Sequence, residues 1–173
     1  MDIVVKNKTT PHSCDWGKKP EKGSKKLPLN KTRFCKYKGT FSWQGIQTER
    51  YKPEGDEWAD IVRQTLIGNH GESAKFHLRY FEIASHGFSS FEMHKHEHVV
   101  IGVRGNGICI AGTKKYKIGF LDTLYIKPNE PHQLKNPYDK PFGFFCIVNA
   151  KRDRPKIIRN GAKSQKKIPA KPE

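Results

Sequence analysis

Four side chains between residues 92 and 98 are suited to bind one metal ion together. Glu92, His94, His96 and His98 occupy alternate positions of the sequence. Successive side chains of a β-strand point to opposite faces, so in a strand these four would project from one face. A carboxylate and several imidazoles pack poorly side by side unless a cation binds them, and both suit divalent first-row metals. The spacing therefore predicts a metal site.

His132 is a further candidate, farther along the chain. It directly follows the segment Pro128-Asn129-Glu130-Pro131. Two prolines fix two backbone φ angles in this short stretch, which predicts a rigid turn. Such a turn can direct one more imidazole toward the same ion.

The first cluster resembles the first motif of the cupin superfamily. That motif is a glycine, a short gap, His-x-His, three or four residues, a glutamate and a closing glycine. Counting from His86-Gly87 at one end and from Gly105 or Gly107 at the other puts Glu92 where the first histidine usually stands. His94 then takes the second histidine position and His98 the glutamate position. Relative to the usual motif, the two outer ligand types are thus exchanged, because the glutamate comes first and the histidine comes last.

The second cluster resembles the second cupin motif, a proline-rich turn followed by a histidine and then an asparagine. His132 and Asn136 match it, whereas Leu121 stands where a glycine usually precedes Asp122. The resemblance covers roughly residues 40–150. This superfamily has many chemistries, so the fold alone does not identify a reaction.

The resemblance implies a ligand set and a cofactor. Glu92, His94, His98 and His132 would hold one divalent transition metal, which is Fe, Mn, Ni, Cu or Zn. His96 lies between the motif positions. His96 is a spare ligand, a residue that supports a ligand without contacting the metal, or a residue of the barrel rim. We favour the rim.

The remaining pattern predicts an all-β fold. Short β-branched and aromatic segments are separated by Gly/Pro turns at intervals typical of a β-sandwich or barrel. Trp58, Ile61 and Val62 could also lie on one face of a helix, although a strand over residues 61–68 is favoured. The cupin resemblance implies a double-stranded β-helix, or jelly-roll barrel. The predicted strands cover residues 61–68, 74–85, 98–112, 115–119, 122–128 and 143–150.

The formal charge of +16 is concentrated at the two ends of the 173 residues. Residues 1–40 hold 11 basic and 3 acidic side chains, and residues 151–173 hold 9 and 2, which leaves the middle nearly neutral. We therefore predict a basic, mobile N-terminal arm (1–33), a cupin barrel (34–150) and a basic, mobile C-terminal tail (151–173).

Charge and cysteine usage also limit the partners. The basic ends would bind nucleic acid only weakly, if at all, because they lack interleaved aromatic residues and a recognition fold. The four cysteines form no C-x-x-C pair, and no apolar run approaches the roughly 20 residues that span a bilayer. We expect a cytoplasmic protein with no membrane contact. The resemblance implies a homodimer.

The leading functional hypothesis is a metal-dependent cupin enzyme of the dioxygenase, decarboxylase, lyase or isomerase type acting on a small polar molecule. A dioxygenase-like oxidoreductase is the first expectation within that range. The alternative is a non-catalytic cupin module that senses a small ligand or a metal. Arg63 and Arg79 would contact a substrate only if they face the pocket, and the sequence leaves their direction open. Cys109 and Cys146 are interpreted as small buried residues.

Overall fold

The computed structural model describes residues 32–52 and 57–158. Within these ranges it contains strands, turns and loops but no helix, and therefore none long and apolar enough to cross a membrane. Most of the predicted N-terminal arm, and the predicted tail beyond residue 158, lie outside the described ranges.

The strands form one curled antiparallel sheet and a separate small hairpin. The sheet contains β3 (Glu49–Arg50), β4 (Ala59–Ile67), β5 (Phe76–Phe88), β6 (Glu92–Met93), β7 (His98–Arg104), β8 (Gly107–Ala111), β9 (Lys114–Ile118), β10 (Thr123–Ile126), β11 (His132–Lys135), β12 (Phe142–Asn149) and β13 (Lys156–Ile157). The hairpin is β1 (Tyr37–Gly39) with β2 (Ser42–Trp43).

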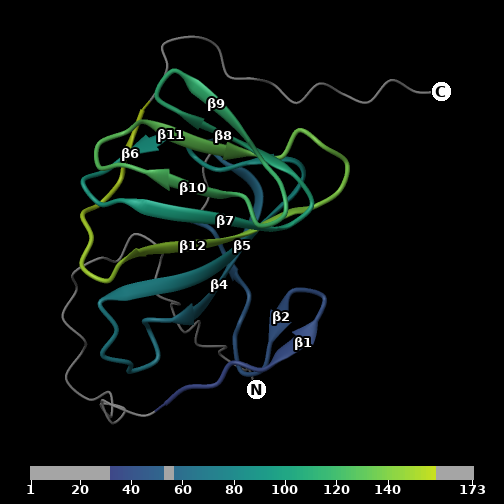
Figure 1. The fold of residues 1–173 in the computed structure, drawn as a ribbon, viewed down its shortest axis with the longest axis vertical. Coiled ribbons are helices and arrows are strands. Elements are labelled where there is room, and N and C mark those ends of the chain that lie inside the picture. The colour runs from purple at the N-terminus through teal and green to yellow at the C-terminus, as the bar shows by residue number, and fades with distance from the viewer. Residues whose placement is uncertain (1–31, 53–56, 159–173) are drawn as a thin grey trace, which may run out of the picture.

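The pairing order closes the sheet almost completely into a barrel. The long strand β5 pairs with β4 and β12, and β12 pairs with β7, which pairs with β10. At its other end β5 meets β11, which also pairs with β6 and β8. Figure 1 shows the strands wrapped around a common interior, with β8, β9 and β11 above β7 and β12. The predicted all-β barrel is confirmed.

Alternating residues of the strands fill the interior. Along β12, Phe144, Cys146 and Val148 are buried in the core, and they pack with residues of the neighbouring strands. Phe145 and Tyr80 belong to the opposite face, where Trp43 of the hairpin covers them at ring distances of 5.9 and 5.2 Å. The hairpin thus seals one outer face of the barrel.

Residues 92–98 do not form one strand, so that part of the prediction is wrong. β6 ends at Met93, and β7 begins only at His98. Between them the backbone finds partners outside the sheet, because Asn129 N donates to His94 O (2.7 Å) and Lys95 N donates to the Asp153 carboxylate (2.8 Å). The chain therefore bends at this point, and the alternation of side chains along a single strand does not describe the directions of residues 92–98.

Residues 151–158 lie against the barrel and are called the C-terminal strap below. β13 of this strap pairs with β6, and Ile158 N donates to Phe91 O (2.9 Å). The sequence predicted a solvated tail for these residues. Instead, Lys156 and Ile157 extend the sheet beside the histidine cluster.

Candidate metal centre

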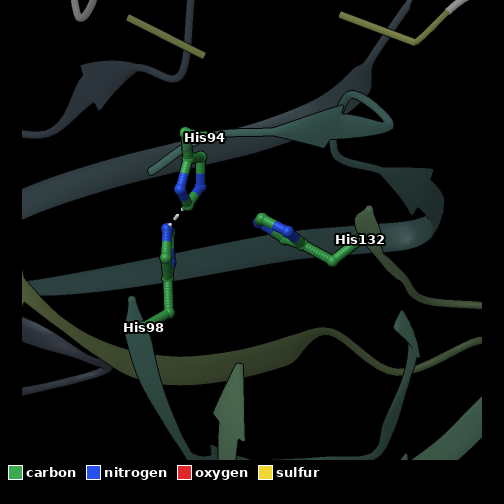
Figure 2. A group of neighbouring side chains, drawn as sticks. All are labelled: His94, His98 and His132. Atoms are coloured by element: carbon green, nitrogen blue, oxygen red, sulfur yellow. Dashed lines mark hydrogen bonds between the residues drawn. The ribbon is translucent and has the colours of Figure 1, made fainter. Parts of the chain in front are cut away.

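Three buried imidazoles converge from three parts of the barrel. His94 lies in the bend after β6, His98 begins β7 and His132 begins β11. One ring nitrogen of each lies within 4.8 Å of the others. Figure 2 shows His94 and His98 pointing toward each other, with the ring of His132 directed at the gap between them. The structure therefore brings together three of the four predicted ligands.

The opposite ring nitrogens are held by fixed partners. Nδ1 of His94 donates to the carbonyl of His96 (2.7 Å), and Nδ1 of His132 donates to the carbonyl of Glu130 (2.8 Å). A carbonyl can only accept, so in the neutral ring the Nε2 atom keeps its lone pair. This is how metal-binding histidines are usually oriented.

His98 completes the set through a partner that can adapt. Its Nε2 lies 2.8 Å from Nε2 of His94, and its Nδ1 lies 3.2 Å from Sγ of Cys146. A thiol can donate or accept a hydrogen bond. When the proton of His98 is on Nε2, this atom donates a hydrogen bond to Nε2 of His94. When the proton is on Nδ1, Nε2 of His98 keeps its lone pair, as Nε2 of His94 does. In the latter form the donor set fits a divalent metal.

Burial keeps the rings of His94 and His98 neutral, which is the form that binds metal. It lowers the pKa of His94 to about 4, with the neighbouring rings of His96 and His132 adding to the effect. Burial also holds the pKa of His98 well below its ordinary value. Protons therefore compete little for these two rings near neutral pH.

Glu92, the fourth predicted ligand, lies opposite His132 in the pairing of β6 with β11. Its Oε2 accepts hydrogen bonds from Lys52 Nζ (2.5 Å) and Ser90 Oγ (2.7 Å). Burial alone would raise the pKa of this carboxyl, but Lys52 and Ser90 more than offset burial and hold the pKa below its ordinary value. Glu92 is thus an ionised carboxylate at the pocket wall, and its role as a ligand stays a prediction.

His96 is buried, so the rim interpretation is wrong. Its ring stacks on that of His94 with a centroid distance of 3.6 Å, and its Nδ1 donates to Asp153 (2.9 Å). Asp153 belongs to the C-terminal strap. The strap therefore fixes His96, and His96 in turn supports one candidate ligand.

A pocket opens beside His98 and His132, two of the three imidazoles. Arg63 and Arg79, whose direction the sequence left open, both line it, and so do Phe81 and Phe144. Sequence reasoning missed Lys52 and Arg152, which also line this pocket. Nothing local in the sequence identifies them, because each is brought there by pairing between distant segments.

Comparison with known proteins establishes the family. The cupin domain model matches residues 79–148. A protein from Rhodospirillum rubrum named 1-methylthio-D-xylulose 5-phosphate methylsulfurylase is 33% identical over 125 residues, which is 72% of this chain and 79% of that protein. The chain is a cupin.

Two solved cupin structures resemble this cupin along most of its length. A cupin-2 domain from Rhodospirillum rubrum is 31% identical with a TM-score of 0.65, covering 73% of this chain and 84% of its own. A cupin 2 conserved barrel domain protein from Rhodopseudomonas palustris is 34% identical with a TM-score of 0.62, covering 66% and 79%.

A histidine outside the cluster gives this cupin a measurable pH response. His77 accepts a hydrogen bond from Arg152 Nη2 (3.1 Å), and burial, then Arg152 and Arg79, lower its pKa from 6.5 to about 4. Between these values the unfolded chain binds a proton that the folded chain does not. The free energy of unfolding therefore falls as pH drops from about 6.5 to about 4. In urea unfolding across this range, His77→Gln should show a shallower pH dependence than the parent, and equal slopes would contradict this prediction.

Proposed function

We propose that this cupin is a metal-dependent enzyme acting on a small phosphorylated sugar or a closely similar molecule. The observation that carries the proposal is the convergence of three buried imidazoles, with two Nδ1 atoms held by carbonyls, next to a pocket rich in cations that His98 and His132 line. A bound divalent metal would supply Lewis acidity toward a carbonyl or hydroxyl oxygen of the substrate.

The residues of the chain have distinct parts in this proposal. His94, His98 and His132 would hold the metal, and Glu92 would supply a fourth, anionic ligand in place of its contact with Lys52. Lys52 then remains at the pocket wall as a hydrogen-bond donor. The apolar rings of Phe81 and Phe144, stacked at 5.4 Å, form a dry side of the pocket.

The substrate class is supported by the curated relative. That protein is named as a methylsulfurylase of 1-methylthio-D-xylulose 5-phosphate, which is a ketose phosphate with a thioether. The similarity extends over 79% of that protein. Among the reaction types expected from the sequence, this substrate favours lyase or isomerase chemistry next to a sugar carbonyl over oxygen-dependent chemistry.

A direct test uses the full chain purified under reducing conditions. Its metal content is measured, and the protein is incubated with 1-methylthio-D-xylulose 5-phosphate, in air and without oxygen, while products are followed by mass spectrometry. We expect bound metal and oxygen-independent turnover that is lost in His132→Ala and kept in His86→Ala, which changes an exposed histidine.

The other outcomes separate the alternatives. A metal-loaded protein that binds ketose phosphates without converting them would support a non-catalytic binding module. A protein that takes up no divalent metal would rule out the proposed function.

A further inference from the structure

We infer that Arg79 and Arg152 form a subsite that binds the phosphate group of the substrate beside the metal centre. This inference deepens the proposed function and rests on it for the rest of the substrate. The anion subsite itself is argued from the cations of the pocket.

Four cationic side chains line the pocket, namely Lys52, Arg63, Arg79 and Arg152. Lys52 is paired with Glu92. Arg63 donates to Glu49 through Nε (3.1 Å) and Nη2 (2.5 Å). These two pairs are locally neutral, so neither adds net positive charge to the pocket.

Arg79 is a buried guanidinium without a counter-ion among the residues that the structure describes. Only 8% of the residue is exposed, and its Nε has no hydrogen-bond acceptor. Its Nη2 donates to the thiol of Cys146 (3.4 Å), and the group lies over the ring of Phe81 (5.0 Å). A buried, uncompensated charge is costly, and an anion in the pocket would remove that cost.

Arg152 is held at the same pocket by the C-terminal strap. Its Nη1 donates to the carbonyl of Asn149 (2.7 Å) and its Nη2 to Nδ1 of His77 (3.1 Å), so the guanidinium plane is fixed. Burial, and then the charge of Arg79, lower the pKa of Arg152 to about 8. The two cations thus repel each other, and an anion near both would relieve this repulsion.

The chemistry and the position favour a phosphate group. Guanidinium groups bind phosphate oxygens through paired, planar hydrogen bonds. Arg79 and His98 contact the same sulfur atom of Cys146, so the subsite is separated from the metal centre by one side chain. A bound sugar phosphate would therefore reach both the subsite, with its phosphate group, and the metal centre, with its sugar.

The test measures binding to the full chain by calorimetry, with and without metal. The probes are inorganic phosphate, D-xylulose 5-phosphate, D-xylulose and malonate. The variants are Arg79→Gln and Arg152→Gln, and Arg154→Gln serves as the matched control because Arg154 is exposed on the same strap. Metal-free protein is included because phosphate can also bind a metal directly.

We expect both pocket variants to lose about tenfold or more in affinity for phosphate and D-xylulose 5-phosphate, with and without metal. Arg154→Gln should behave like the parent, and D-xylulose binding should be the same in all proteins. If Arg79→Gln does not fold, Arg152→Gln at the barrel edge decides the question.

Two results would overturn the inference. One is the same phosphate affinity in Arg152→Gln, Arg154→Gln and the parent. The other is tighter binding of malonate than of phosphate, which would assign the subsite to carboxylates. Arginine-dependent phosphate binding in a protein that takes up no metal would refute the proposed function and leave the subsite standing. Turnover of the sugar phosphate by a protein whose phosphate binding does not depend on Arg79 or Arg152 would refute only the subsite.

Discussion

Replacing His94 with alanine is expected to remove nearly all bound metal from the purified protein. His94 lies closest to His98 and is held on its other side by the carbonyl of His96. Loss of a group behind a ligand typically costs 10–100-fold in metal affinity, so we expect loss of the ligand itself to cost about a hundredfold or more. His132→Ala should have the same effect. Elemental analysis of dialysed protein measures it.

The control for this experiment is His86→Ala. His86 is exposed and lies near Asp139 on the surface, so its loss should leave the metal content unchanged. His96→Ala should have a smaller effect than His94→Ala, because His96 stacks on a candidate ligand and supports it. Metal retained by a protein lacking both His94 and His132 would refute the metal centre.

Replacing Lys52 with methionine should destabilise the metal-free protein by about 3–5 kcal/mol, the typical cost of leaving one member of a buried ion pair alone. Lys52 and Glu92 are both about 10% exposed and lie 2.5 Å apart. If Glu92 binds the metal, added metal should restore more stability to Lys52→Met than to the parent, because the ion replaces the lost cation. Urea unfolding with and without metal measures both quantities.

Two further variants make this experiment decisive. Lys52→Met combined with Glu92→Gln should recover part of the lost stability, since the buried charge is gone. Lys127→Met breaks the surface pair with Glu130, in which Lys127 is exposed, and should change the unfolding midpoint little. Equal stabilisation of the parent and Lys52→Met by metal would exclude Glu92 as a ligand.

The sequence predicted the strands and three clustered histidines because both depend on local pattern. Alternation and Gly/Pro turns are properties of neighbouring residues, and they located β5, β7 and β12 within a few positions. The motif order placed His132 with His94 and His98.

Features that depend on distant segments were not predictable in this way. The bend after Met93 needs Asn129 and Asp153, and the burial of His96 needs Asp153. Arg152 reaches the pocket only because β13 pairs with β6. The homodimer, the cytoplasmic location, the domain limits and the mobility of the basic ends stay predictions.

The C-terminal strap also determines when the site can be completed during synthesis. Asp153 holds His96, and β13 closes the edge of β6, so a nascent chain that has exposed only residues up to 150 has its histidines but lacks their outer support. Ribosome-bound chains ending before this strap should therefore capture metal more weakly than chains in which it has emerged. In this proposal, full metal affinity requires that the strap itself, and not only the three histidines, has emerged.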